Sequence, residues 1–230
     1  PAAMDPFDVV ATEAGPAGIT AAKPAADLGA RVAMAERGPL GGLCINRGCI
    51  PKKALVTAGR LHRVVRESAG FATRPGRTAL DWEAVIQRQN EVVDSLRPTV
   101  ADLEKRGIRV SIGVAHFTDP HIVEVNGVPI AAERFIIAAG SEPEIPEVPG
   151  RDLLITSDQL LFLPAFPSSL TFIGAGPVAL ELASAFCDFG SRVTVLGRDA
   201  EVLPGGDPDV ARYLRKILEG RGVPFRLQTT

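Results

Sequence analysis

Short apolar runs alternate with small-residue and amphipathic stretches along the chain, and this alternation predicts an α/β fold. Apolar runs of strand length occupy residues 7–11, 31–35, 170–173 and 192–196. A glycine-rich turn and a helix of small residues separate the first run from the second, and the third from the fourth. Strand, helix and strand in this order predict a Rossmann-like βαβ unit with parallel strands, present twice.

The rest of the chain carries further helix and strand patterns. Asp81 begins an amphipathic helix that Pro98 interrupts. Asn126-Gly127 is a hairpin turn signal between apolar runs, which favours a small β-meander. The remaining expected elements are a helix from 53 to about 65, strands at 108–112, 122–125 and 128–131, a helix opening at 207–208, and a third strand of the second unit ending at Thr230.

The two βαβ units align with each other without a gap when the sequence is shifted by 161 positions. Residues 14–16 (Ala-Gly-Pro) fall on residues 175–177, and residues 31–32 (Arg-Val) fall on residues 192–193. Such a duplication predicts two nucleotide-binding domains rather than one.

The glycine-rich turns predict where a dinucleotide pyrophosphate would dock. A pyrophosphate binds free backbone N–H groups at the positive end of a helix, and glycines let the backbone turn tightly and approach closely. The first turn offers Gly15 and Gly18, and the second offers Gly174, Gly176 and Ala179. One such motif alone is weak evidence, but two copies in register are specific.

The residue after each second strand distinguishes the two sites. Glu36 lies where an acidic residue would accept hydrogen bonds from a ribose diol. The aligned position of the second copy is Gly197, followed by Arg198, whose guanidinium could pair with a 2′-phosphate. We therefore expect the second site to prefer NADPH over NADH. The alternative is that Arg198 is only a solvated loop charge.

Composition and charge argue against several classes of partner. The net charge of −2 and the lack of a long basic run speak against nucleic acid and acidic membrane surfaces. No apolar stretch reaches the roughly 18 residues that a membrane-spanning helix needs. The chain has 3 cysteines, which indicates a reducing, cytoplasmic compartment, where a close cysteine pair is more often catalytic or metal-binding than structural.

Cys44 and Cys49 form a Cys-x4-Cys pair at a predicted helix entrance. This spacing lets two sulfurs come within bridging distance, and the positive end of the helix would stabilise a thiolate on Cys49. The alternatives are half of a zinc site and two inert buried thiols. Zinc takes about four ligands in nearby pairs. Cys187 and the histidines form no such pair, so we expect no metal site.

Residues 41–53 (Gly-Gly-Leu-Cys-Ile-Asn-Arg-Gly-Cys-Ile-Pro-Lys-Lys) resemble the redox motif of the class I pyridine nucleotide-disulfide oxidoreductases. This family includes glutathione reductase, mercuric reductase and dihydrolipoamide dehydrogenase. Residues 138–143 (Ala-Ala-Gly-Ser-Glu-Pro) look like the segment at the end of the family's FAD domain, and residues 117–120 and 179–183 also match. The resemblance runs from Phe7 to the last residues and corresponds to the family's N-terminal half.

The resemblance implies roles for individual residues. Cys44 would be the thiol that exchanges with the substrate disulfide, and Cys49 the thiol beside the flavin. Lys53 would lie near the flavin, paired with Glu181 from the other domain, because a cation there stabilises the reduced ring. The FAD contacts carried over are Gly15, Gly18, Glu36, Gly42, Lys53, Ala115 and Gly140.

Four residues depart from the family pattern. Glu13 stands where the second copy has Gly174, so we expect a side chain that obstructs the turn and a carboxylate that repels the pyrophosphate. Leu43 and Ala139 replace threonines that the family usually places near FAD. Pro24 falls in the first helix and would cost about 3 kcal/mol unless the helix kinks. These departures predict weakened FAD binding on an intact fold.

We therefore expect a two-domain chain that is the front part of a longer protein. Residues 1–149 would be the first segment of an FAD-binding domain with the cysteine pair, and residues 150–230 an incomplete NAD(P)-binding domain, with a proline-rich linker at 143–150. The resemblance implies that the natural parent continues beyond Thr230 and is a homodimer, and that this chain alone lacks steady turnover.

Two hypotheses for function follow. The first is an oxidoreductase that passes electrons from NADPH through FAD to Cys44–Cys49, and on to a small-molecule disulfide or mercuric substrate. The resemblance leaves these two substrates nearly equal, while dihydrolipoamide dehydrogenase is less favoured because position 197 is not acidic. The second hypothesis is a truncated, catalytically incompetent nucleotide-binding fragment, which Glu13 and Pro24 favour.

Overall fold

A computed structural model describes residues 6–71 and 79–229, and the chain divides into two compact units. Unit 1 comprises Pro1–Ile50 and Val93–Glu144, and unit 2 comprises Pro51–Val92 and Ile145–Thr230. The chain therefore enters unit 2, returns to unit 1 and enters unit 2 again. The assignment of residues 1–149 to FAD and residues 150–230 to NAD(P) concerns ligands and stays a prediction.

Unit 1 is built on one mixed sheet with the strand order β3-β2-β1-β6-β5-β4. The strands are β1 (Phe7–Thr12), β2 (Val32–Glu36), β3 (Ile108–Ile112), β4 (Ala115–Asp119), β5 (Ile122–Val125) and β6 (Val128–Ile137). Strands β3, β2, β1 and β6 are parallel, whereas β4, β5 and β6 form the predicted antiparallel meander. The arrangement is that of a Rossmann-like α/β domain.

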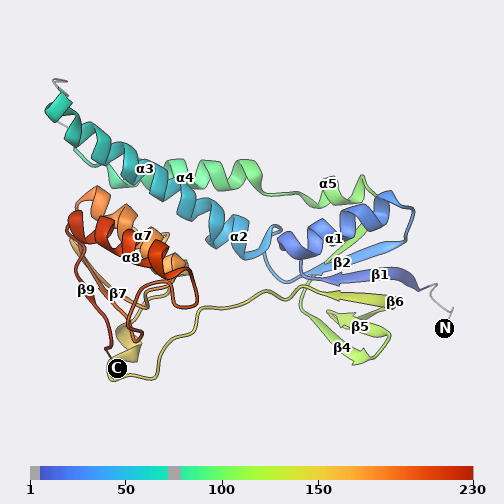
Figure 1. Ribbon diagram of the computed structural model, residues 1–230. Helices are drawn as coiled ribbons and strands as arrows, with labels where there is room; N and C mark the ends of the chain where they lie inside the picture. The colour runs from blue at the N-terminus through green and yellow to red at the C-terminus, as the bar shows by residue number, and fades with distance from the viewer. Residues whose placement is uncertain (1–5, 72–78, 230) are drawn as a thin grey trace. The chain divides into compact units, whose positions relative to one another are not determined.

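The two faces of this sheet bury different partners because successive side chains of a strand point to opposite faces. Ala11 and Met34 pack with residues of α1 (Pro16–Asp27) and α5 (Val100–Glu104) on one face. Val10 and Ala33 pack with Val123 of the meander on the other face. Figure 1 shows α1 and α5 on the side of the sheet opposite the meander strands β4 and β5. Strand β2 is buried along its whole length, as expected between two covered faces.

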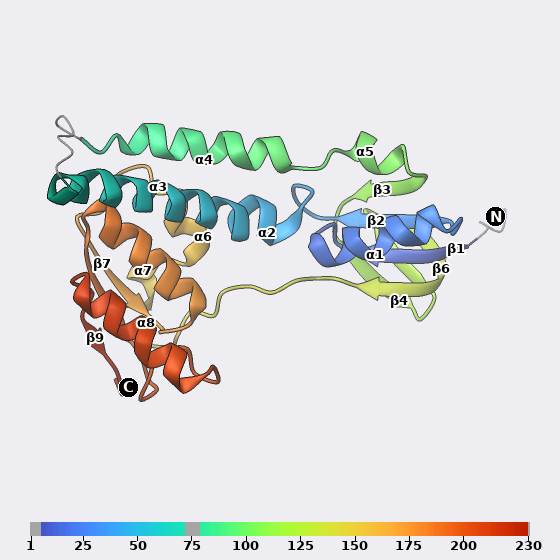
Figure 2. The same ribbon diagram turned by 45° about the horizontal axis from the view of Figure 1, so that its top comes forward.

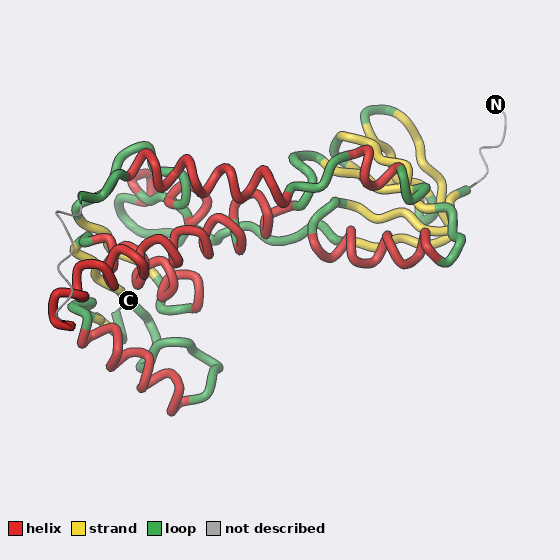
Figure 3. The backbone as a smooth tube through the Cα atoms, turned by 90° about the horizontal axis from the view of Figure 1, so that it is seen from above, coloured by secondary structure: helices red, strands yellow, loops and turns green. Residues whose placement is uncertain are grey.

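The structure confirms the predicted hairpin in unit 1 but shows no break of helix α1 at Pro24. Asn126 and Gly127 have φ of 51° and 78° and join β5 to β6, so the hairpin is confirmed. Helix α1 continues through Pro24 to Asp27, and Figure 3 draws it as one uninterrupted coil. The proline removes one N–H from the helix ladder, yet the Leu28 N–H still donates to the Pro24 carbonyl at 3.0 Å.

Unit 2 contains the second βαβ unit on a parallel sheet of order β7-β8-β9. Its strands are β7 (Ser169–Ile173), β8 (Arg192–Leu196) and β9 (Phe225–Arg226), and its helices are α3 (Cys49–Glu67, of which Cys49 and Ile50 belong to unit 1), η1 (Ser68–Phe71), α4 (Trp82–Leu96, in unit 2 up to Val92), η2 (Arg151–Leu153), α6 (Ser157–Leu160), α7 (Pro177–Phe189) and α8 (Pro208–Gly220). Thr230, the predicted end of the third strand, lies outside the described residues. Helix α3 begins four residues earlier than the predicted start at Lys53.

Helices α3 and α4 run side by side in Figures 1 and 2, and unit 2 buries an aromatic core that includes both. Trp82 of α4 lies 5.7 Å from the Phe186 ring of α7, and its indole N–H donates to the Leu163 carbonyl at 2.8 Å. Gln89 is buried and donates to the Leu161 carbonyl at 2.8 Å. The predicted amphipathic helix is thus confirmed, with Trp82 and Gln89 on its buried face, whereas Leu96 near its end is exposed. Among the described helices, none is both long and apolar enough to cross a membrane.

Candidate nucleotide-binding and redox sites

The glycine-rich turn of unit 1 joins β1 to α1 and depends on close backbone approach. Gly15 is the N-cap residue of α1, so the first N–H groups of the helix point out of the turn. A Cβ on Gly18 would lie 2.0 Å from the Glu13 carbonyl oxygen. Only glycine fits at position 18, which agrees with the close helix–strand packing expected of this residue.

The turn of unit 2 has the same backbone arrangement. Glu13 has φ of 80° and its N–H donates to the Ala35 carbonyl at 2.7 Å. At the aligned positions Gly174 has φ of 112° and donates to the Leu196 carbonyl at 2.9 Å. We expected the Glu13 side chain to obstruct the turn. This expectation is wrong, because the backbone at Glu13 adopts the same left-handed conformation as Gly174.

Gly42 closes over the turn of unit 1 from the loop before α2 (Gly42–Arg47). A Cβ on Gly42 would lie 2.7 Å from the Gly15 Cα atom, and the Gly41 N–H donates to the Ala14 carbonyl at 2.8 Å. Two glycines in contact leave backbone without side chains at the open end of α1. This glycine cradle suits a dinucleotide pyrophosphate, since a larger residue at either position would fill it.

Glu36 lies beside the cradle at the end of β2 and is almost completely buried. Its two carboxylate oxygens accept the N–H of Ala14 at 2.8 Å and the N–H of Gly38 at 2.7 Å. The Glu13 carboxyl forms a hydrogen bond to Glu36. The pKa of Glu13 is raised to about 7, first by burial and then by this hydrogen bond and the charge of Glu36. Arg37, whose Nε lies 3.7 Å from the Glu13 carboxyl, opposes this rise.

Two further predicted FAD contacts follow strands of the same sheet. The Gly113 N–H donates to the Glu36 carbonyl at 2.8 Å, and Ala115 begins β4 two residues later. Gly140 follows the end of β6, where Ile137 pairs with Thr12, and its φ of 75° favours glycine. Hydrogen bonds and close contacts thus bring together Gly15, Gly42, Glu36 and Gly113. The FAD contacts themselves stay predictions.

Cys44 and Cys49 lie on either side of a sharp turn in the backbone of unit 1. Cys44 is half-buried in α2, and Cys49 is exposed as the first residue of α3. Between them, a Cβ on Gly48 would lie 2.9 Å from the Leu43 carbonyl oxygen, so the chain folds back tightly at glycine. A thiol at the first residue of a 19-residue helix is next to the positive end of the helix dipole.

Asn46 fixes this loop and was missed by the sequence analysis. Its amide nitrogen lies within hydrogen-bonding distance of the carbonyls of Pro39, Leu40 and Gly42 at 3.1, 3.0 and 2.9 Å. Its amide oxygen accepts from Arg97 Nε at 2.7 Å. Asn46 thereby ties the cysteine-bearing helix α2 to the glycine cradle. The position of Asn46 midway between the two cysteines is the only sequence signal that could have indicated this role.

Lys53 and Glu181 are paired, but both lie in unit 2 and not in two different domains as expected, and a second lysine shares the carboxylate. Lys53 Nζ lies 2.5 Å from Glu181 Oε1, and Lys52 Nζ contacts Oε2. Burial alone would raise the pKa of Glu181, but the hydrogen bonds and charges of the two lysines outweigh it and lower this pKa. All three residues belong to unit 2, where the carboxylate joins α3 to α7.

The turn of unit 2 lies open at the predicted nucleotide contacts. Cβ atoms at Gly174 and Gly176 would meet nothing within 4 Å, and Ala179 is half-buried in α7. A Cβ on Gly197 would lie 2.9 Å from Leu227 and 3.2 Å from the Ala175 side chain. Packing thus disfavours an acidic residue at position 197. The Arg198 side chain is 88% exposed, and its Nε lies 3.8 Å from Asp199.

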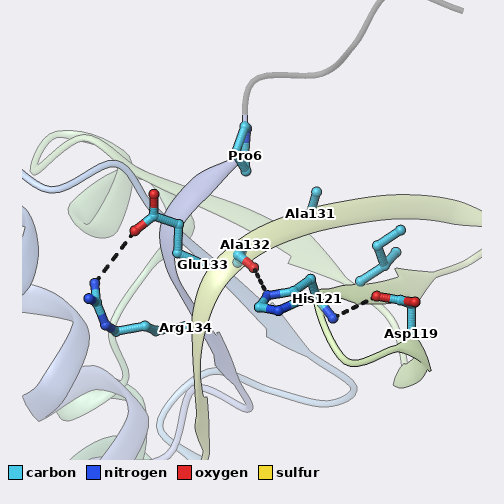
Figure 4. Close-up of a pocket in the computed structure, with 8 residues that line it drawn as sticks. Pro6, Asp119, His121, Ala131, Ala132, Glu133 and Arg134 are labelled. Carbon is cyan, nitrogen blue, oxygen red and sulfur yellow. Dashed lines mark hydrogen bonds and ion pairs between the residues drawn. The ribbon is translucent and has the colours of Figure 1, made fainter.

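A separate pocket of about 500 Å³ lies in unit 1 and contains none of the predicted site residues. Figure 4 shows His121 in it, with Nδ1 3.2 Å from the Ala132 carbonyl and its backbone N–H on Asp119, and a neighbouring Glu133–Arg134 ion pair. Among the described residues, no group of three or more His, Cys, Asp and Glu side chains is placed to hold a metal ion.

Two βαβ units, each with a glycine-rich turn at the start of its helix, define a protein of the dinucleotide-binding α/β class. The chain belongs to the pyridine nucleotide-disulphide oxidoreductase family, which matches residues 7–230. This is a family of FAD-dependent oxidoreductases that use pyridine nucleotides, so the recognition made from residues 41–53 is confirmed.

Relatives with several named activities are similarly close. The chain is 32% identical over 225 residues to a dihydrolipoyl dehydrogenase of Acholeplasma laidlawii, covering 94% of this chain and 67% of that protein. It is 34% identical to a glutathione reductase of a Nostoc species, with 94% and 48% covered, and 33% identical to a mercuric reductase of Bacillus cereus, with 94% and 35% covered.

A solved structure of the flavoprotein disulfide reductase RclA from Escherichia coli, described as an HOCl-induced protein in its Cu(II) complex, superposes with a TM-score of 0.82 at 34% identity. The match covers 96% of this chain and 49% of that one. The chain thus spans between about a third and two thirds of the length of these proteins. These matches establish the family and the two-unit fold.

Proposed function

We propose that the protein of which this chain is a part transfers two electrons from NADPH, through FAD bound by unit 1, to the Cys44–Cys49 pair. The observation that carries this proposal is the glycine cradle of Gly15 and Gly42, since α2 begins at Gly42 and carries Cys44 two residues further along. The cysteine-bearing loop and the dinucleotide turn are therefore one connected structure in unit 1.

The cofactor would supply hydride acceptance from NADPH and delivery of the electron pair to a disulfide. The residues that would hold it are Gly15, Gly18 and Gly42 at the pyrophosphate, and Glu36 at the ribose. The additional contacts that the resemblance assigns to Ala115, Gly140 and Lys53 remain part of the proposal. The role of Lys53 beside the flavin rests on the resemblance alone.

The cysteines would then carry out thiol–disulfide exchange. The Cys44 thiolate attacks one sulfur of the substrate disulfide, forms a mixed disulfide and expels the other sulfur as a thiolate, which takes up a proton. The Cys49 thiolate attacks the Cys44 sulfur, releases the second substrate thiolate and closes the Cys44–Cys49 disulfide. Cys49 is exposed at the first residue of α3, which leaves its sulfur accessible for this exchange. A mercuric ion held by the two thiolates is the alternative substrate.

The nucleotide preference is proposed from the second turn. Gly197 leaves no carboxylate to bind a ribose 2′-hydroxyl, and the exposed Arg198 guanidinium can reach a 2′-phosphate. The dihydrolipoyl dehydrogenase relatives keep an NADH-linked reaction as the alternative. Homodimerisation and a cytoplasmic location, inferred from the resemblance and from the sparse cysteines, belong to the same proposal.

Reconstitution with FAD tests the proposal. The purified chain should bind FAD and become yellow, and partial reduction with dithionite should produce a long-wavelength absorption band from the Cys49 thiolate. The band should be lost in Cys49→Ser and kept in Cys44→Ser, which is the matched control because it removes the other sulfur of the pair. A chain that is colourless after incubation with FAD at any concentration and removal of the unbound FAD would contradict the proposal and support a nucleotide-binding fragment without redox function, which the Glu13 carboxyl at the turn favours.

A further inference from the structure

The two glycine-rich turns share a backbone but differ in charge. Glu13 and Gly174 occupy the same left-handed position, and their N–H groups make the same hydrogen bond to the following strand. Glu36 and Gly197 likewise occupy aligned positions. Unit 1 therefore places two carboxyl groups where unit 2 has two glycines, on a turn that would face a doubly charged pyrophosphate.

The two carboxyl groups can form their hydrogen bond only when they hold a proton between them. Glu36 accepts one backbone N–H on each of its oxygens, and N–H donors stabilise the ionised form of a carboxylate. Glu13 also accepts a backbone hydrogen bond, from Arg37, which lowers its pKa, but burial and the contact with Glu36 outweigh this bond and raise the pKa of Glu13 to about 7. The shared proton therefore belongs on Glu13, which donates to Glu36.

Arg37 and Glu142 are the other charged residues near the Glu13 carboxyl. Arg37 lowers the pKa of Glu13, but less than burial and Glu36 raise it. Arg37 faces Glu13 at 3.7 Å, and its guanidinium also lies 3.3 Å from Glu142 in the segment after β6. The Arg37 side chain is 45% exposed and contacts the carboxyl groups of both Glu13 and Glu142. These two residues and Glu36 are the charged groups that the structure places around the Glu13 carboxyl within the described residues.

We propose that unit 1 binds its dinucleotide together with one proton, which Glu13 holds against Glu36. This inference rests on the proposed FAD site of unit 1. With Glu13 ionised, two carboxylates would stand beside the pyrophosphate, and repulsion would oppose binding. With Glu13 protonated, one negative charge is removed and Glu36 remains as the hydrogen-bond acceptor for the ribose. Binding of FAD therefore takes up a proton from solvent.

The expected signature is an FAD dissociation constant that rises with pH. Because one proton is linked to binding, the constant should change little below about pH 6 and rise towards tenfold per pH unit above about pH 7. Glu13→Gln keeps a side-chain donor towards Glu36 and carries no charge, so its dissociation constant should stay low and flat. Glu13→Gly restores the residue of the second turn and should also remove the pH dependence.

The experiment measures FAD binding to the full chain by fluorescence anisotropy of FAD between pH 5.5 and 8.5, for the unmodified protein and for Glu13→Gln, Glu13→Gly and Glu133→Gln. Glu133 is a carboxylate of the same unit that pairs with Arg134, so Glu133→Gln should keep the slope of the unmodified protein. Calorimetry at pH 8 in two buffers of different ionisation enthalpy counts protons directly, and uptake should approach one in the unmodified protein and zero in Glu13→Gln.

The outcomes separate this inference from the function on which it rests. FAD binding with a flat pH profile and no proton uptake in the unmodified protein overturns the proton linkage and leaves the FAD site intact. A slope that persists in both Glu13 variants also overturns it, because another group would then carry the proton. Failure of the unmodified protein and both Glu13 variants to bind FAD at any pH overturns the proposed FAD site together with the linkage.

Discussion

Glu13 combines a strained backbone with a carboxyl group whose pKa is raised to about 7. A non-glycine residue at φ of 80° costs on the order of 1 kcal/mol, and the structure accepts that cost because the turn requires this conformation. The aligned Gly174 shows the same turn without the cost. Position 13 is therefore the point in unit 1 where a single substitution should improve stability.

We expect Glu13→Gly to stabilise the protein and to reduce its pH dependence. The pKa of Glu13 is raised from 4.5 to about 7, so the folded state binds more protons than the unfolded state between these values. Stability therefore falls as pH rises from about 4.5 through 7. Urea unfolding at pH 5 and pH 8 should show a gain of about 1 kcal/mol at pH 5 from relief of strain, and a larger gain at pH 8. An equal gain at both pH values would contradict the raised pKa.

The residue scale also shows what sequence could not reveal. The resemblance identified Lys53 and Glu181, and the structure pairs them, but Lys52 contacts the same carboxylate. A sequence motif identifies Lys53 by its spacing from the cysteines. It does not show that the neighbouring Lys52 on α3 can also contact Glu181 on α7. The hydrogen bond between Glu13 and Glu36 was unpredicted for the same reason, although both residues had been singled out.

At the scale of elements, α3 and α7 approach each other closely through Gly59. A Cβ on Gly59 would lie 2.8 Å from the Ala185 carbonyl oxygen and 3.4 Å from the Asp188 side chain. Asp188 is itself buried and pairs with Arg63 Nε at 3.0 Å. The glycine therefore sets the distance between the helices and allows this ion pair to form.

Gly59→Ala should destabilise unit 2 by about 2 kcal/mol, because the added methyl group forces the two helices apart. The matched control is Gly220→Ala at the end of α8, where an added Cβ meets nothing within 4 Å. That substitution should be neutral or stabilise by up to about 1 kcal/mol, as expected from helix propensity. Chemical denaturation followed by Trp82 fluorescence measures both variants, and similar effects of the two would show that Gly59 has no role in packing.

Element boundaries were predicted less well than element types. The helix expected to begin at Lys53 begins at Cys49, because Pro51 lies in its first turn, where the missing N–H costs no hydrogen bond. Pro51 is therefore compatible with the helix start. The consequence for the site is direct, since Cys49 becomes the first residue of the helix rather than a residue before it.

At the scale of the whole chain, the duplication was predictable and the path of the chain was not. The shift of 161 positions aligns two turns whose φ values and strand hydrogen bonds agree, so sequence alone indicated two Rossmann-like units. The placement of Pro51–Val92 in unit 2 was not foreseen. An amphipathic pattern such as that of Trp82 and Gln89 shows that a helix face is buried but does not say which sheet or helix covers it.

Trp82 fluorescence can report how NADPH and NADH each stabilise unit 2, because Trp82 is the only tryptophan in the sequence and lies in the core of that unit. A ligand at a hundred times its dissociation constant stabilises the protein by about 2.7 kcal/mol. NADPH should therefore raise the unfolding midpoint followed by Trp82 fluorescence more than NADH does at the same concentration. Arg198→Ala should remove about 2 kcal/mol of that stabilisation by NADPH, the usual contribution of a hydrogen bond to a charged group, and leave the effect of NADH unchanged.

Arg212→Ala is the matched control for Arg198→Ala, because Arg212 is also exposed and pairs with a nearby carboxylate, Asp209. It removes the same charge from unit 2 and should leave the response to NADPH intact. Equal stabilisation by NADH and NADPH in the unmodified protein would show that Arg198 is only a solvated loop charge. In that case the packing of Gly197 against Leu227 and Ala175 suffices to explain the glycine there. A selective loss in Arg198→Ala would instead assign the 2′-phosphate to this guanidinium.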